Sequence, residues 1–200
     1  MSAIDATTAV ANAVDDELIV LVDEDGTPTG TAAKRASHHA DTPLHLAFSC
    51  YVFDEEGRFL ATRRARSKAV WPGVWSNTVC GHPGPGESVP EAIRRRLDYE
   101  LGMAAGRIEL AVADHLYRAP AFRGVVEHEF CPVYVARAVG QPRPNPVEVE
   151  DCAWMGWEAF VRGALEDCAD EWSWWCKNQL RELRGNALVE RYMLPASTAG

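Results

Sequence analysis

The sequence predicts one domain that mixes helices and strands, of the α/β or α+β class. The chain has 200 residues, of which 47% are hydrophobic and 24% charged, and this suits a single globular core. Apolar runs closed by turn residues are followed by helical patterns, with no internal repeat. The 15 glycines and 12 prolines are close to average usage, which excludes collagen-like and disordered chains.

The two ends of the chain are expected to lie outside this domain. Residues 1–16 are rich in Ala and Thr without a periodic pattern, so we expect a mobile tail there, with the domain over 17–190 and a C-terminal tail over 191–200. No Lys or Arg precedes Lys34 and no run is long enough to span a bilayer. Because the six cysteines form no CxxC pair, we expect reduced thiols in a cytoplasmic protein.

The first half of the chain is predicted to form hairpins. An apolar run at Glu17–Val22 ends in the turn sequence Asp23–Gly26, which predicts a strand and a tight return. A longer strand is expected over Leu44–Phe53. It is closed by Asp54–Gly57 before a return strand through Phe59–Ala61.

A helix is predicted over Val89–Leu101. It follows a capping-box pattern at Ser88-Val89-Pro90-Glu91 and stops at Leu101-Gly102. The 3.6-residue period places Glu100 in the middle of the apolar stripe, where a lone carboxylate is costly. Two partners remain open for Glu100, a salt bridge to Arg96 or a bound cation.

In the second half, strands are predicted at Leu110–Tyr117 and Val125–Val139, and Pro132 interrupts the second of them. A helix is predicted at Asp170–Arg184. On the second strand Glu127 and Glu129 are two residues apart and therefore project from the same face, while His128 points the other way.

The formal net charge is −9, which argues against nucleic-acid and membrane partners. A local basic patch still exists between Gly57 and Cys80, where no acid occurs. Its cations are Arg58, Arg63, Arg64, Arg66 and Lys68. Such a patch suits an anionic small molecule, although a solvated surface loop explains the charges equally well.

Several residue types that bind metals or transfer protons stand out. A mixed nitrogen and oxygen donor set suits a divalent ion of the Mn, Fe or Zn kind more than Ca. The candidate donors are His38, His45, His82, Glu127 and Glu129. Cys80 lies in segment 70–87, which is rich in Trp, Pro and Gly. Three roles remain open for its side chain: a nucleophile, a thiol that acts as acid or base, or a metal ligand.

Part of this segment resembles the Nudix box, whose helix holds a metal-bound diphosphate. The matching positions are Gly81, Glu87, Arg95, Leu97, Glu100, Gly102 and Met103. The usual box has Glu where this chain has Arg96 and Tyr99. The loss of these two acids argues against hydrolysis of nucleoside diphosphates.

Longer stretches resemble the type I isopentenyl-diphosphate isomerases of the Nudix superfamily. These stretches are HHADTPLHLAFS from His38, RRARSKAVWPGVWSNTVCGHPGPGE from Arg63, RRRLDYELG from Arg94 and VVEHEFCPVY from Val125. The resemblance runs from about residue 17 to 175. It implies a Nudix-type α/β/α sandwich with a mixed central sheet.

The resemblance also implies an activity, the interconversion of isopentenyl and dimethylallyl diphosphates by protonation and deprotonation in isoprenoid biosynthesis. In that family the residues matching Cys80 and Glu129 are the proton donor and acceptor. The five His and Glu donors named above match the ligands of a Mn- or Zn-type ion. Glu100, with the backbone carbonyl of Cys80 and the substrate diphosphate, is similar to the family's Mg²⁺ site.

Further roles follow from the same resemblance. Tyr117 and Trp175 match the aromatic groups beside the carbocation, with Trp174 as a rival for Trp175. The residues matching diphosphate contacts are Lys34, Arg64, Lys68 and Arg96. Two other functions stay open at this point, a Nudix diphosphohydrolase and a non-catalytic diphosphate-binding module. The oligomeric state, monomer or homodimer, is not decided by the sequence.

Overall fold

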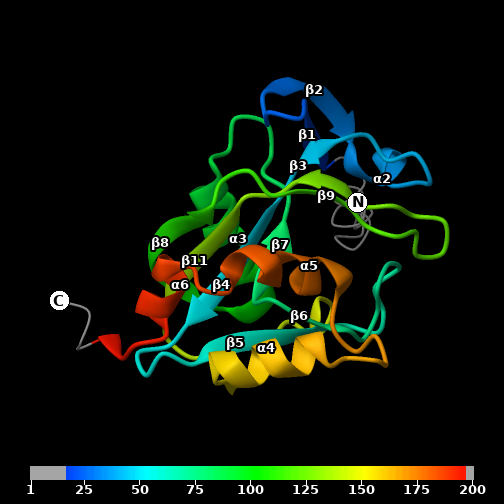
Figure 1. Cartoon of the computed structure of the whole chain (residues 1–200). Coiled ribbons are helices and arrows are strands. Elements are labelled where there is room, and N and C mark those ends of the chain that lie inside the picture. The colour runs from blue at the N-terminus through cyan, green and yellow to red at the C-terminus, as the bar shows by residue number, and fades with distance from the viewer. Residues whose placement is uncertain (1–16, 197–200) are drawn as a thin grey trace, which may run out of the picture.

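The computed structural model describes residues 17–196, which form two β-sheets with most of the helices packed around one of them (Figure 1). The helices of this range are α2 (Lys34–Ser37), α3 (Val89–Leu101), α4 (Trp157–Leu165), α5 (Trp174–Leu183) and α6 (Ala187–Tyr192). The expected N-terminal tail, residues 1–16, lies outside the described residues. Within residues 17–196, no helix is long and apolar enough to cross a membrane.

The central sheet has seven strands in the order β12-β5-β4-β11-β8, with β6 paired to β5 and β7 paired to β4. Its strands are β4 (Phe48–Phe53), β5 (Phe59–Arg64), β6 (Trp75–Ser76), β7 (Val79–Gly81), β8 (Ala104–Val112), β11 (Val133–Val139) and β12 (Val149–Met155). Strands β4 and β11 are parallel and the other pairs are antiparallel, so the sheet is mixed as predicted.

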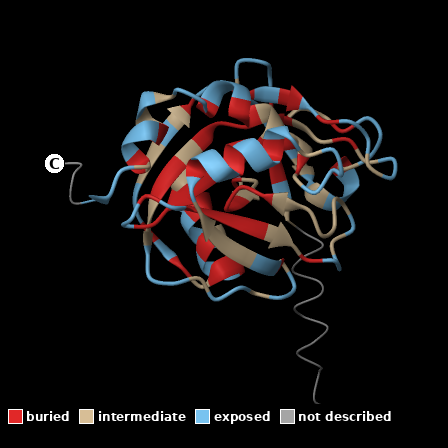
Figure 2. Ribbon diagram, turned by 60° about the horizontal axis from the view of Figure 1, so that its bottom comes forward, coloured by how far each residue is buried: buried red, intermediate tan, exposed pale blue. Residues whose placement is uncertain are grey.

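Helices cover both faces of this sheet, which confirms the predicted α/β/α sandwich. Along β4, Phe48, Cys50 and Val52 pack with α3, while Tyr51 and Phe53 pack with α4, α5 and α6. The alternation follows from the period of two along a strand. Buried residues accordingly concentrate in the central strands and on the inward faces of the helices (Figure 2).

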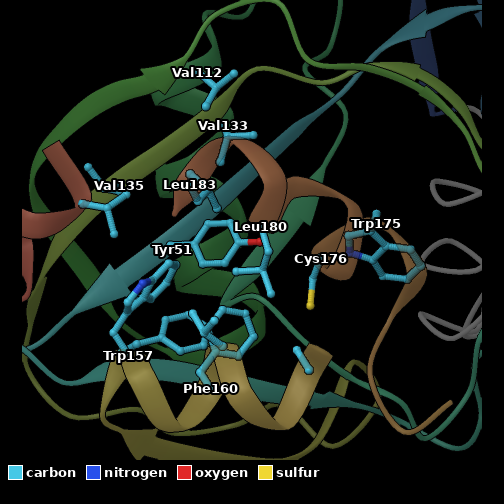
Figure 3. Close-up of a cluster of buried hydrophobic side chains, with 14 of the residues drawn as sticks. Tyr51, Val112, Val133, Val135, Trp157, Phe160, Trp175, Cys176, Leu180 and Leu183 are labelled. Atoms are coloured by element: carbon cyan, nitrogen blue, oxygen red, sulfur yellow. The ribbon is translucent and has the colours of Figure 1, made fainter. Parts of the chain in front are cut away.

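Aromatic side chains dominate the second of these two cores (Figure 3). Tyr51 packs its ring against Trp157 from α4, with 5.8 Å between ring centroids, and Phe160 is fully buried beside them. The Tyr51 hydroxyl donates a 2.8 Å hydrogen bond to Gln179 Oε1 on α5. This bond satisfies a phenol that would otherwise be buried without a partner.

A second sheet, which the sequence did not predict, has five strands in the order β2-β1-β3-β10-β9. Its strands are β1 (Leu18–Val22), β2 (Pro28–Ala33), β3 (His45–Leu46), β9 (Leu116–Arg118) and β10 (His128–Phe130). The predicted strand over Leu44–Phe53 is therefore wrong as one element. It breaks at Ala47, whose N–H donates to Phe130 O, and continues as β4 in the other sheet.

Two other predicted elements, a strand and a helix, also have different bounds in the structure. The strand expected over Leu110–Tyr117 is two strands, since β8 begins at Ala104 and ends at Val112 before β9 begins. The helix expected from Asp170 begins at Trp174, because the Asp167 carboxylate accepts hydrogen bonds from backbone N–H groups up to Trp172 and fixes a turn. Near the C-terminal end of the described residues, Tyr192 in α6 is buried.

Candidate active site

Sheet register brings the predicted site residues together where the chain passes between the two sheets. Glu129 on β10 lies opposite His45 on β3 and opposite Tyr117 on β9. Cys80 on β7 lies opposite Ser49 on β4. Strands from distant parts of the sequence therefore place these side chains on a hydrogen-bonded frame rather than on loops.

Three imidazoles converge from separate segments. His38 follows α2 and its Nδ1 is 2.6 Å from Lys34 O, while His45 Nδ1 is 2.9 Å from Pro43 O. A carbonyl oxygen only accepts, so each Nδ1 carries a hydrogen, and Nε2 is the nitrogen left to bind a metal. His45 Nε2 lies 3.1 Å from His82 Nε2. Backbone carbonyls thus orient His38 and His45 as metal-binding histidines usually are.

Two carboxylates complete the cluster. Glu127 Oε2 is 3.6 Å from His38 Nε2, and Glu129 Oε1 is 3.2 Å from His82 Nε2. Both acids face the histidines as predicted, although β10 begins only at His128 and Glu127 precedes it, and His128 turns away toward Arg118. Burial, together with the charge of Glu129, raises the pKa of Glu127.

This cluster fits a divalent cation. The buried Glu127 Oε2 has no hydrogen-bond partner among the described residues, although a buried carboxylate oxygen normally needs one. Burial also lowers the pKa of His82 well below its ordinary value and keeps the imidazole neutral, which is the form that coordinates metals. Imidazole and carboxylate donors suit Mn, Fe or Zn, so the predicted donor set and the geometry agree.

Cys80 lies beside the cluster as a protonated thiol. Its Sγ donates to Asn77 Oδ1 at 3.0 Å and lies 3.4 Å from Ser49 Oγ. Burial raises the pKa of Cys80 to about 11, and the nearby charge of Glu129 acts in the same direction. At neutral pH this side chain is therefore a proton donor rather than a thiolate nucleophile.

Tyr117 holds the Glu129 carboxylate. The phenol donates a 2.6 Å hydrogen bond to Glu129 Oε2, and both residues are buried. Burial and the charge of Glu129 raise the pKa of Tyr117 well above its ordinary value, so the phenol remains a donor. Glu129 is in this way fixed by Tyr117 on one oxygen and faces the histidines with the other.

Both candidate tryptophans lie in the first turn of α5. The Trp175 Nε1–H donates to Ser76 Oγ at 2.9 Å and to Asn77 Oδ1 at 3.2 Å, so it shares Asn77 with Cys80. The Arg64 guanidinium lies 5.6 Å from the Trp175 ring. Trp174 instead packs 5.6 Å from the ring of Tyr117. Trp175 therefore shares a hydrogen-bond partner with Cys80, and Trp174 packs on the residue that holds Glu129.

The predicted diphosphate contacts are already paired with acids or carbonyls. Arg96 Nη2 lies 2.7 Å from Glu100 Oε1, which confirms the salt bridge considered for that inward carboxylate. Burial raises the pKa of Glu100. Lys68 and Arg96 both contact Glu148, Lys34 contacts Glu17, and Arg64 donates to the carbonyls of Val70 and Trp71.

Sequence reasoning missed Glu148 and the residues that hold Cys80. Glu148 is one of several acids in the stretch 148–151, and nothing in the pattern distinguishes it. Ser49 lies inside a predicted strand and Asn77 in a predicted loop. A small polar residue next to an apolar run is common there, so it does not indicate a contact with the active site. Their roles become visible only through strand pairing.

Comparisons with known proteins agree with this geometry. A NUDIX domain family model matches residues 43–184. The chain is 55% identical over 152 residues to the isopentenyl-diphosphate Delta-isomerase of Frankia alni, covering 76% of this chain and 78% of that relative. It is 50% identical over 173 residues to the isopentenyl-diphosphate Delta-isomerase of Paenarthrobacter aurescens, covering 86% and 94%.

A solved structure from Deinococcus radiodurans has the same fold. It superposes on 82% of this chain and on 98% of its own length, with a TM-score of 0.63 and 19% sequence identity.

Proposed function

The chain belongs to the NUDIX family and, within it, to the isopentenyl-diphosphate Delta-isomerases, and from this membership we propose that Cys80 and Glu129 perform its proton transfers. The enzyme is an isomerase that interconverts isopentenyl and dimethylallyl diphosphates. The observation that carries the proposal is the presence, in one site, of the protonated Cys80 thiol and of the Glu129 carboxylate, which Tyr117 holds through one oxygen.

The reaction requires a strong, positioned acid and a base on the other side of the carbon skeleton. Cys80 donates its proton to the terminal alkene carbon, which leaves a tertiary carbocation. Glu129 then removes a proton from the carbon next to the CH₂–O group, and the double bond forms one position along. General acid and base groups of this kind contribute roughly 10²–10⁴-fold each to the rate.

An aromatic face beside the cation stabilises it. We assign this role to Trp175, whose hydrogen bonds to Ser76 and Asn77 fix the ring close to Cys80. Cation–π attraction is worth about 2 kcal/mol or more when the pair is desolvated. Trp174 remains the rival, because it borders Tyr117 on the Glu129 side of the site.

NUDIX enzymes typically use divalent metals, and the described residues contain His and Glu groups able to hold one. We propose that His38, His45, His82, Glu127 and Glu129 hold a Mn²⁺ or Zn²⁺ ion. When bound, such an ion supplies positive charge that fixes the Glu129 carboxylate. For Mg²⁺ we propose Glu100, the Cys80 backbone carbonyl and the substrate diphosphate.

The diphosphate group is proposed to be bound by Lys34, Arg64, Lys68 and Arg96. Their present partners, Glu17, Glu148 and two backbone carbonyls, hold these cations oriented before substrate arrives. A diphosphate can replace some of these contacts with charge-assisted hydrogen bonds, which are about twice as strong as neutral ones.

One proton NMR experiment tests this function. Isopentenyl diphosphate incubated with the protein, Mg²⁺ and Mn²⁺ should lose its terminal CH₂ signals and gain the two methyl signals of the isomer. Release of inorganic phosphate without those methyl signals would favour a diphosphohydrolase, and unchanged substrate with saturable binding would favour a binding module.

A further inference from the structure

Trp71 has a backbone conformation that bulky residues rarely adopt. Its φ is 51°, in the left-handed region, where the Cβ atom crowds the backbone and glycine is the usual residue. Two hydrogen bonds from Arg64 hold this strained turn, one from Nε to Trp71 O at 3.1 Å and one from Nη2 to Val70 O at 3.0 Å. Strain of this kind persists only where the surroundings impose it, and it is concentrated at functional sites. The strain therefore suggests a function for Trp71.

The Trp71 ring contacts two other aromatic rings. It stacks on Phe122, with 4.9 Å between ring centroids and 30° between ring planes, and it packs perpendicular to Trp175 at 6.0 Å. Phe122 begins a tight hairpin turn, because it exchanges two backbone hydrogen bonds with Val125 and both residues between them have positive φ. A hairpin turn behind one ring and the buried position of the other fix the orientation of the Trp71 indole.

The indole N–H of Trp71 is a donor without an acceptor. Its Nε1 atom is buried and has no hydrogen-bond partner within residues 17–196, whereas the Trp175 N–H has two partners. An unpaired buried donor costs free energy, so buried donors are nearly always bound by protein, water or a ligand. The Trp71 N–H is therefore able to bind a molecule that enters the site.

The chemistry of the substrate decides which of its atoms can accept this hydrogen bond. This step rests on the proposed function. The isopentenyl and dimethylallyl groups contain only carbon and hydrogen, so every acceptor of either substrate is an oxygen of the diphosphate. The place of Trp71 agrees with this, since the Arg64 guanidinium, a proposed diphosphate contact, binds the Trp71 carbonyl and lies 5.6 Å from the same Trp175 ring.

We propose that Trp71 is a further substrate-binding residue, whose indole N–H donates a hydrogen bond to an oxygen of the diphosphate. This bond adds a neutral donor to the four cations proposed for the same group. The Trp71 ring also packs on Trp175, to which the carbocation is assigned. Trp71 therefore connects the diphosphate end of the site with the alkene end.

The change Trp71→Phe tests the hydrogen bond, because it keeps an aromatic ring beside Phe122 and removes the donor. The dissociation constant of inorganic pyrophosphate, measured by calorimetry with Mg²⁺ present, should rise by about tenfold or more, as expected when a hydrogen bond to a charged group is lost. The KM for isopentenyl diphosphate should rise by a similar factor. The kcat should stay within a few-fold of the native value, because Cys80, Glu129 and Trp175 are unchanged.

The matched control is Trp75→Phe. Trp75 lies in the same segment 70–87, but its ring packs on Trp172, with 6.2 Å between centroids. This variant should keep the native pyrophosphate affinity and KM. A direct measurement on the native protein needs no variant. In a two-dimensional NMR spectrum of the indole N–H groups, the Trp71 signal should move downfield when pyrophosphate and Mg²⁺ are added.

The proposal is wrong if Trp71→Phe binds pyrophosphate as the native protein does, or if the Trp71 indole signal does not move. It is equally wrong if Trp75→Phe weakens binding as much, since the effect would then come from a loosened segment, or if Trp71→Phe loses kcat at an unchanged KM. The pyrophosphate measurements require no turnover. A native protein that binds pyrophosphate through Trp71 but does not isomerise isopentenyl diphosphate would refute the proposed function and leave this binding role intact.

Discussion

His45 and Glu129 lie directly opposite each other in the parallel pairing of β3 with β10, with 3.7 Å between His45 Nε2 and Glu129 Oε1. The same register continues in the other sheet, where Ser49 lies opposite Val133, four residues further along both strands (45 to 49 and 129 to 133). A slip of one residue would turn Glu129 to the opposite face. The sheet backbone therefore fixes the distance between a proposed metal ligand and the proposed base.

Removing either acid of this cluster should weaken metal binding, but with different effects on activity. Glu127→Gln and Glu129→Gln should each lose on the order of tenfold or more in metal affinity. Excess Mn²⁺ should restore most of the activity of Glu127→Gln, since its base is intact, and little of that of Glu129→Gln. Elemental analysis and a rate assay across a Mn²⁺ titration measure both effects.

The matched control for these acids is Glu109→Gln, which alters an ion pair with Arg191 away from the cluster. It should keep native metal content and rate. Full restoration of Glu129→Gln by Mn²⁺ would show that Glu129 is a ligand only. Native turnover by enzyme shown to be free of metal would refute the metal assignment altogether.

Changes at Trp175 should distinguish an aromatic face from simple bulk. Trp175→Phe keeps a π face and should retain partial activity, whereas Trp175→Leu should lose nearly all of it. Both changes remove the indole donor to Ser76 and Asn77, so the difference between them isolates the ring. The rate at saturating substrate is the measurement. Equal rates for Trp175→Phe and Trp175→Leu, or a larger loss of rate in Trp174→Leu, would assign the role to Trp174 instead.

Local signals predicted much of the fold. The helix α3 has the predicted bounds, because Ser88 and Glu91 form a capping box and Gly102 ends the helix in the left-handed conformation at φ 54°. The first strand and its hairpin were also predicted correctly. These elements depend on residues within a few positions of one another, and a local sequence pattern can predict structure of this kind.

Features that depend on pairing between distant strands could not be predicted. Nothing near Ala47 indicates that the chain changes sheets there, since the flanking apolar residues suit either sheet. The contact of Ser49 with Cys80 and Cys131 likewise joins three segments of the chain. The donors of the metal cluster could be identified from residue type, but the meeting of His45 with Glu129 depends on the register of β3 and β10.

The ion pair at the start of α3 should make stability depend on pH. The hydrogen bond from Arg95 lowers the pKa of Glu87 below its ordinary value of 4.5. A carboxyl whose pKa is lower in the folded state stabilises the fold at pH values above its pKa in the unfolded state. This contribution is lost as the pH falls through its pKa in the folded state. Glu87→Gln should thus lower Tm at pH 7, by about 1–3 °C for a partly exposed pair, and this difference should shrink as the pH falls below 4.5.

Thermal melts of both proteins across this pH range provide the measurement. Glu56→Gln is the control, because its 3.3 Å pair with Arg58 is more exposed and should contribute less. A Tm difference between native and Glu87→Gln that stays constant down to the lowest pH at which both proteins remain folded would contradict the ionic origin of the effect.

Replacing Cys80 tests the acid on which the mechanism depends. Cys80→Ala should fold and bind the diphosphate, because the cations Arg64, Lys68 and Arg96 are untouched, yet its rate should fall by about 10² or more. Cys152→Ala removes a thiol away from the site and should keep the native rate. Native turnover in deuterium oxide should place deuterium in the new methyl group, since the Cys80 thiol exchanges with solvent when the site is free. Near-native isomerisation by Cys80→Ala would show that another group protonates the alkene.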